Sequence, residues 1–287
     1  MPSGRIDWLA SYPKSGNTWM RMLLANYFNE TDQPQDINAP GVTKGIASSR
    51  MRFDDFLGIN SSDLTMEEIK NLQPEVYRMM TDGAECHQWI KVHDAQLRNS
   101  EGQWLFPPEV TGVVVYLIRN PLDVVVSMAF HDGHQDIDQS IAKLCSSATV
   151  LAGLPDIQLP QQVGCWSEHV KSWVDQDDMP ALVVRYEDLL SDTAAKFVDV
   201  LEFARPDAVV DRDKVAQAVA HSEFDRLSAA EGEFDFREKP QKAAKFFRKG
   251  VSGDWRNHLN SAQVAKICDV NGSMMERFGY ADEGGMP

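Results

Sequence analysis

The chain has 287 residues, 43% of them hydrophobic and 25% charged, which is ordinary for a globular protein. Its formal net charge of −15 argues against a broad surface for nucleic acid or for an anionic membrane, because both need basic patches. The four cysteines are widely spaced and form no C-x-x-C pair. This gives little support to a zinc or redox site and predicts reduced thiols in a cytoplasmic protein.

The first predicted elements are a short buried strand over residues 6–12 and a helix that follows a tight loop. Such a helix N-terminus favours an anion, because its first N–H groups lack partners within the helix and its dipole is positive there. The loop adds a cation, hydroxyl groups and a glycine, which makes a phosphate-binding turn of Lys14, Ser15, Gly16, Asn17 and Thr18. In the P-loop of kinases the lysine stands where this chain has Asn17, and here the lysine lies three positions upstream. The alternative is a strand-to-helix connection with an incidental lysine.

Residues 29–60 are rich in Asp, Asn, Pro and Gly and predict a long loop with at most short helical turns. A stripe of apolar residues then predicts a helix over 65–81 that Thr65 can cap. The next predicted strand contains Lys91 and ends just before His93. Ligands of open α/β sheets gather at the carboxyl ends of strands, and histidine is the natural general base near neutral pH. The alternative is a histidine that is hydrogen-bonded at a strand end.

The clearest strand covers residues 112–119, and its nearly continuous apolar character predicts burial on both faces of a parallel sheet. Asn120 can cap the helix that follows, so Arg119 lies beside a second helix N-terminus, and Ser127 falls within that helix. These residues predict a second anion site. The next loop offers metal-binding residue types without a strong metal signature, so we expect solvated side chains and no metal at His131, Asp132, His134 and Asp136.

The C-terminal half continues the alternation of helices and strands. A helix over 163–174 carries Trp166 and Trp173 as core anchors, and a strand over 181–188 contains Tyr186. Further helices are predicted over residues 191–203, 211–221 and 261–278.

Residues 237–249 carry six basic residues and one acidic residue, which locally reverses the charge of the chain. The segment ends in Arg248 and Lys249, followed by Gly250. By itself it suggests a basic loop for a phosphate, for RNA, or for nothing specific. Residues 281–287 are small and polar and are expected to fray.

Together these segments resemble the cytosolic sulfotransferases, which use 3'-phosphoadenosine 5'-phosphosulfate (PAPS) and release 3'-phosphoadenosine 5'-phosphate (PAP). Residues 12–19 match the family pattern Tyr-Pro-Lys-Ser-Gly-Thr-Thr-Trp except at Asn17, whose amide can still donate a hydrogen bond. Residues 91–93 resemble Lys-Thr-His, and residues 119–127 resemble Arg-Asn-Pro-x-Asp-x-x-x-Ser. Residues 248–257 resemble Arg-Lys-Gly-x-x-Gly-Asp-Trp-Lys-Asn. The resemblance implies one α/β domain over residues 1–287, with a central parallel sheet flanked by helices and a fold related to P-loop nucleotide kinases.

The resemblance also implies roles for individual residues. His93 would be the general base, with Lys14, Lys91 and Ser127 as further catalytic residues. Tyr186 would reach the adenine of PAPS, and Trp19 and Phe224 would stack on it, although a buried phenylalanine is an equal alternative for Phe224. The other residues expected to bind PAPS are Lys14, Ser15, Gly16, Asn17, Thr18, Arg119, Ser127, Arg248, Lys249 and Gly250.

Two other functions remain open at this point, namely a kinase that uses ATP and Mg²⁺ and a non-catalytic PAP-binding protein. A small-molecule or carrier-bound acceptor is expected, but the sequence does not separate a phenol from an alcohol, a sugar, an amine or a carrier-bound chain. The family's dimerisation pattern is not matched at residues 260–264, so no oligomeric state is predicted.

Overall fold

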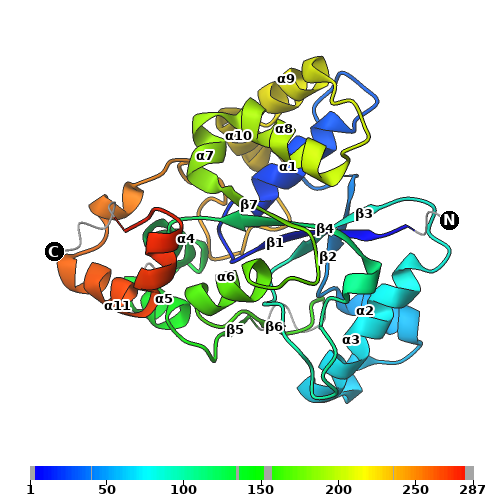
Figure 1. Cartoon of the computed structure of the whole chain (residues 1–287). Coiled ribbons are helices and arrows are strands. Elements are labelled where there is room, and N and C mark those ends of the chain that lie inside the picture. Colours follow the sequence, from blue (N-terminus) through cyan, green and yellow to red (C-terminus); the bar gives the residue numbers. More distant parts are fainter. Residues whose placement is uncertain (1–3, 40, 134–135, 152–156, 235, 282–287) are drawn as a thin grey trace. The chain divides into compact units, whose positions relative to one another are not determined.

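The computed structural model describes residues 4–39, 41–133, 136–151, 157–234 and 236–281. Most of the predicted frayed tail, residues 282–287, lies outside these ranges. Five strands form one sheet in the order β2-β3-β1-β4-β7 (Figure 1). The strands are β1 (Ile6–Ser11), β2 (Thr43–Ile46), β3 (Gln88–Val92), β4 (Thr111–Ile118) and β7 (Ala181–Arg185). A separate antiparallel pair is formed by β5 (Val150–Leu151) and β6 (Gln161–Gln162).

The sheet is parallel and buried where it carries the first motif. β3 pairs in parallel with both β1 and β2, and the ladder between β1 and β3 runs from Ile6 and Gln88 to Ala10 and Val92. All six residues of β1 are buried, as expected for a strand of a parallel sheet covered on both faces. The predicted α/β class, with a central parallel sheet flanked by helices, is confirmed.

The chain forms two compact units, each built from three segments and described here by itself. The first unit contains the described residues of Met1–Tyr12, Thr43–Tyr116 and Ser147–Val183. The second contains the described residues of Pro13–Val42, Leu117–Ser146 and Val184–Pro287. That residues 1–287 form a single domain stays a prediction.

In the first unit, aromatic rings attach the helices to the sheet. Its α-helices are α2 (Arg50–Leu57), α3 (Met66–Thr81) and α6 (Trp166–Val174). Thr65 caps α3 in a reciprocal capping box with Glu68, as its sequence indicates. The ring of Trp8 on β1 lies edge-on to Tyr77 of α3 and to Phe106, with 5.0 Å between ring centroids in both pairs.

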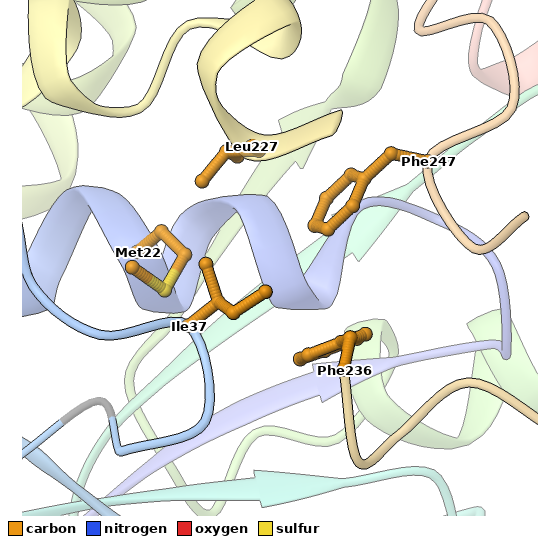
Figure 2. Packing of buried hydrophobic residues seen from close by; sticks show 5 residues of the cluster. All are labelled: Met22, Ile37, Leu227, Phe236 and Phe247. Atoms are coloured by element: carbon orange, nitrogen blue, oxygen red, sulfur yellow. The ribbon is translucent and has the colours of Figure 1, made fainter. Parts of the chain in front are cut away.

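In the second unit, a hydrophobic cluster fixes the first helix. The cluster consists of Met22, Ile37, Leu227, Phe236 and Phe247, whose side chains point toward one another in Figure 2. The helices of this unit are α1 (Asn17–Tyr27), α4 (Pro121–His131), α5 (Ile137–Leu144), α7 (Tyr186–Ser191), α8 (Thr193–Ala204), α9 (Arg212–His221), α10 (Phe224–Phe234) and α11 (Ser261–Arg277). The cluster joins α1 and α10 to the basic segment that precedes the last motif.

Two predicted elements differ from the structure. Residues 29–60 were expected to form a loop, but they contain β2 and α2, because Thr43–Ile46 finds a pairing partner in β3 and Ser49 caps α2 by accepting a hydrogen bond from Arg52. The strand expected over 181–188 ends at Arg185, since Tyr186 begins α7. Within the described part of the chain, no helix is long and apolar enough to cross a membrane.

Candidate functional site

The loop after β1 has the backbone of an anion site. Lys14 has φ of 70° and is the only non-glycine residue with a positive φ among the described residues. Gly16, with φ of 98°, precedes α1 directly. In α1, all of whose residues are described, there is neither a side-chain cap nor an acidic residue in the first turn. A helix that starts in this way favours a negatively charged ligand at its N-terminus.

Two details of the loop fit a phosphate or sulfate group. The hydroxyl of Ser15 is buried and has no hydrogen-bond partner among the described residues. A Cβ atom on Gly16 would lie 2.8 Å from the ring of Tyr186, so only glycine fits here. A buried polar atom without a partner is costly, so this hydroxyl is available to a group bound in the loop.

Arg119 connects three predicted site segments. Its guanidinium donates to the carbonyl oxygen of Lys14 at 3.2 Å and to that of Val251 at 3.0 Å. Its Cζ atom lies 4.2 Å from the centroid of the Tyr186 ring. Its buried Nε has no partner among the residues that the structure describes. The structure therefore brings together the first loop, the start of α4 and the last motif.

Lys14 lies over an aromatic ring that none of the sequence motifs contains. Its Nζ lies 4.2 Å from the centroid of the Phe246 ring, a cation–π distance. Phe246 stands two residues before Arg248, so the basic segment also restrains the lysine of the first loop. Ser127 lies half-buried on α4.

The predicted phosphate-binding cations of the last motif are held by one carboxylate. Asp254 accepts hydrogen bonds from Arg248 at 2.6 Å and from Lys249 at 2.7 Å, and His258 Nε2 lies 3.2 Å away. Burial raises the pKa of Asp254, but the hydrogen bonds from Lys249 and Arg248 outweigh it and hold this pKa well below its usual value. The group keeps a surplus of positive charge near neutral pH, which suits a phosphate.

Asp123 ties the last motif to α4. It is buried in the first turn of α4 and accepts hydrogen bonds from the backbone N–H groups of Gly253 at 2.7 Å and Trp255 at 3.0 Å. Asn120 caps α4 by accepting a hydrogen bond from Leu122, as predicted. From sequence, Asp123 is only a favourable charge at a helix start, because its partners lie 130 and 132 residues away.

The predicted adenine-binding side chains lie in the same unit. Trp19 donates to the carbonyl oxygen of Ser222 at 3.0 Å and lies edge-on to Tyr186, with 5.8 Å between ring centroids. Phe224 covers Gly250, where a Cβ atom would lie 2.2 Å from its ring and where φ is 63°. Trp19 and Phe224 also pack against the hydrophobic cluster, so the buried role of Phe224 stays open.

In the first unit, the hydrogen bonds of His93 define its tautomer. His93 follows β3, and its Nδ1 lies 2.9 Å from the carbonyl oxygen of Ser11 and 3.2 Å from the hydroxyl of Ser11. A carbonyl oxygen can only accept, so in the neutral ring Nδ1 carries the proton and Nε2 carries the basic lone pair. Lys91 lies half-buried on β3, two residues earlier.

Two buried titratable groups beside His93 were missed from sequence. His169 is fully buried, and burial lowers its pKa to about 4. Asp94 is buried as well, and burial raises its pKa to about 7 although the charge of Lys70 opposes this. Its Oδ1 accepts a hydrogen bond from the N–H of Gln162 at 2.9 Å, while its Oδ2 has no partner among the described residues. The sequence could have indicated that His169 is buried, because this histidine falls on the apolar face of a predicted helix.

Two of the residues considered as metal ligands, His131 and Asp132, pair with each other. His131 Nδ1 lies 3.5 Å from Asp132, and Lys143 donates to Asp132 at 2.6 Å. His134 lies outside the described residues, and Asp136 caps α5 by accepting a hydrogen bond from Gln139. Within the described ranges no group of three or more His, Cys, Asp or Glu side chains could hold a metal ion.

Comparison with known proteins gives a consistent result. A family model described as "Sulfotransferase domain" matches residues 7–279. Sulfotransferase 1E1 of Rattus norvegicus is 26% identical over 261 residues, covering 88% of this chain and 78% of the relative. Sulfotransferase 2B1 of Mus musculus is 31% identical over 167 residues, covering 52% of this chain and 44% of the relative.

Solved structures share the fold. The mouse sulfotransferase SULT7A1 complexed with PAP superposes with a TM-score of 0.60 at 18% identity, covering 99% of this chain and 87% of the other. Retinol dehydratase in complex with retinol and PAP gives a TM-score of 0.59 at 19% identity, covering 96% and 83%.

Proposed function

The chain belongs to the sulfotransferase family, and from this premise we propose that it transfers the sulfuryl group of PAPS to a hydroxyl or amine of a small-molecule or carrier-bound acceptor. The observation that carries the proposal is the arrangement around the first loop. An uncapped helix start, the buried hydroxyl of Ser15 and the guanidinium of Arg119 meet within one compact unit. PAP in both solved neighbours supports the choice of nucleotide.

The residues that would hold PAPS follow from this arrangement. Lys14, Ser15, Gly16, Asn17 and Thr18 would take the 5'-phosphosulfate, with the first N–H groups of α1. The 3'-phosphate would be held by Arg119, Ser127, Arg248, Lys249 and Gly250, and the adenine by Trp19, Tyr186 and Phe224. When bound, PAPS supplies the sulfuryl group and its leaving phosphate.

His93 would act as the general base through Nε2, which takes the proton of the acceptor as the new bond to sulfur forms. Its Nδ1 proton is held by Ser11, which keeps the lone pair on Nε2. Lys14, Lys91 and Ser127 would stabilise the charge that develops on the sulfuryl oxygens and on the departing 5'-phosphate. Preorganised donors commonly contribute about 10²–10³ in rate each.

We propose that no metal is required, because Lys14, Arg119 and Arg248 supply the positive charge that Mg²⁺ supplies in kinases. A kinase that uses ATP and Mg²⁺ is the second candidate, and Asn17 at the Walker lysine position argues against it. A cytoplasmic location stays a prediction, supported by the widely spaced cysteines.

Nucleotide binding is tested first, by thermal unfolding with PAP, with AMP, and with ATP plus Mg²⁺, each with and without EDTA. A ligand at a hundred times its Kd stabilises the fold by about 2.7 kcal/mol, which raises Tm by several degrees. We expect this shift with PAP, unaffected by EDTA, and a smaller one with AMP, which lacks the 3'-phosphate. A shift only with ATP and Mg²⁺ would establish the kinase instead.

The base is tested by His93→Gln. We expect PAP affinity within twofold of the original chain and loss of turnover in an acceptor screen with PAPS. The screen starts with lipophilic alcohols, because one solved neighbour binds retinol. Turnover that survives in His93→Gln removes His93 from the role of base.

A further inference from the structure

We propose that His169 and Trp173 of α6 are positioning residues that fix His93 by gripping two successive backbone carbonyls. His169 Nε2 lies 3.0 Å from the carbonyl oxygen of His93. Trp173 Nε1 donates to the carbonyl oxygen of Asp94 at 2.9 Å. The two side chains are four residues apart, so they project from the same face of the helix. The inference rests on the proposed role of His93 as the base.

His93 needs such partners because it lies beyond the sheet. The ladder between β1 and β3 ends at the pair Ala10 and Val92. The carbonyl groups of residues 93 and 94 are therefore not part of that ladder, and α6 supplies their donors instead. The ring of His93 is held by the carbonyl oxygen of Ser11, at the end of β1. Backbone and ring are thus fixed by two different elements.

The protonation of His169 is also fixed. Its Nε2 faces a carbonyl oxygen and must carry the proton, so its Nδ1 accepts from the hydroxyl of Tyr116 at 2.8 Å. Both side chains are fully buried, and the low pKa of His169 keeps the ring neutral near neutral pH. The hydrogen bonds run in one direction, from Tyr116 through His169 to the backbone of His93. A network in which every member has its partner holds its geometry firmly.

The position of a general base affects the rate of the reaction strongly enough to be measured. A catalytic group displaced by about 1 Å can lose about 10²-fold in rate. Loss of either donor from α6 also leaves a carbonyl oxygen at the end of β3 without its partner, which favours a shift of the strand end. Movement of the strand end carries the ring of His93 with it and loosens its hydrogen bond to Ser11.

The test uses histidine ring ¹⁵N NMR of the full chain, which reports the tautomer of His93 directly and needs no acceptor. The His93 signals are assigned by their absence in His93→Gln. In the original chain we expect one tautomer, with the proton on Nδ1. In His169→Leu and in Trp173→Phe we expect the two nitrogen shifts of His93 to move toward each other, as the tautomers mix, and its titration midpoint to change.

Matched variants separate positioning from general stability. His169→Gln keeps an amide donor near the place of Nε2 and should restore most of the original His93 signals. Trp166→Phe changes the same residue type in the same helix without removing either of these two hydrogen bonds, and should leave the signals unchanged. PAP affinity, measured by calorimetry, should stay within twofold in every variant, because the PAP-binding candidates lie in the other unit.

Unchanged His93 signals in folded His169→Leu and Trp173→Phe would overturn the proposal, even where Tm falls. If His169→Leu does not fold, Trp173→Phe and Tyr116→Phe decide the question, since each removes one polar group and keeps a ring of similar shape. Failure of the proposed function has a different signature, namely turnover that persists in His93→Gln.

Discussion

Asp123→Ala is expected to weaken both the fold and the binding of PAP. The Asp123 carboxylate accepts two buried backbone hydrogen bonds, at 2.7 Å from Gly253 and 3.0 Å from Trp255. An unsatisfied buried donor costs about 1–3 kcal/mol, and a carboxylate in the first turn of a helix contributes about 0.3–1 kcal/mol. The sum is about 2–7 kcal/mol, and partial access of water to the loop favours the lower half of that range.

The expected change in melting temperature follows from the size of the chain. Unfolding entropy of about 2.1 cal/mol/K per residue gives about 0.6 kcal/mol/K for this chain, so a loss of about 3 kcal/mol lowers Tm by about 5 °C. The loop that Asp123 holds also carries Asp254, which orients Arg248 and Lys249. We therefore expect PAP to bind at least about tenfold more weakly, an apparent loss of about 1.4 kcal/mol.

Calorimetric unfolding and titration with PAP measure the two effects. Asp123→Asn keeps one acceptor oxygen and should fall between the original chain and Asp123→Ala. Asp138→Ala is the matched control, because Asp138 is an exposed residue in the first turn of α5, and its carboxylate accepts a hydrogen bond from the side chain of Gln263 at 2.9 Å. It should change the free energy of unfolding by less than about 0.5 kcal/mol. Unchanged Tm and PAP affinity in Asp123→Ala would refute the reasoning.

Two further changes test other parts of the chain. Because burial raises the pKa of Asp94 to about 7, the native state holds its proton longer than the unfolded state, so the free energy of unfolding should fall as pH rises from about 4 to 7. Asp94→Asn keeps an acceptor for Gln162 and should flatten this slope in urea unfolding, whereas an identical pH dependence would contradict the assignment. Phe246→Leu removes the ring under Lys14 at a cost of about 0.5–2 kcal/mol and should weaken PAP binding about two- to thirtyfold in calorimetry. Phe246→Tyr should bind PAP normally, and normal binding by the leucine variant would exclude the cation–π contact from nucleotide binding.

Structural elements that depend on interactions between residues close in sequence were predictable. Thr65 caps α3 with a residue three positions away, and Asn120 caps α4 two positions away, so the short-range pattern contains the whole interaction. β4 was predictable because its nearly continuous apolar sequence is typical of a strand that is buried on both faces of a parallel sheet. Trp166 and Trp173 were expected as core anchors, and both are fully buried.

Structural features that depend on partners far away in the sequence were not predictable. The residues of β2 have no marked strand pattern in the sequence. They form a strand because they pair in parallel with β3. The roles of Asp123 and His169 likewise depend on partners 130 and 76 residues away. Tyr186 shows the limit of a local pattern, since a strand was expected to continue where a helix begins. Single-sequence reasoning located the ligand-binding candidates through their motifs but not the side chains that support them.

The order in which the segments leave the ribosome has a consequence for the growing chain. The last segment of the first compact unit ends at Val183, so His93 and its α6 partners emerge before the last segment of the second unit. The second unit needs Asp254 beside Arg248, and Tyr280, whose hydroxyl donates to Glu187 at 2.9 Å. Since domains form as their residues emerge, the candidate nucleotide-binding residues are complete only after Arg248, Lys249 and Gly250 have emerged. Donor nucleotide can therefore act as a stabilising ligand only after this segment of the chain has been made.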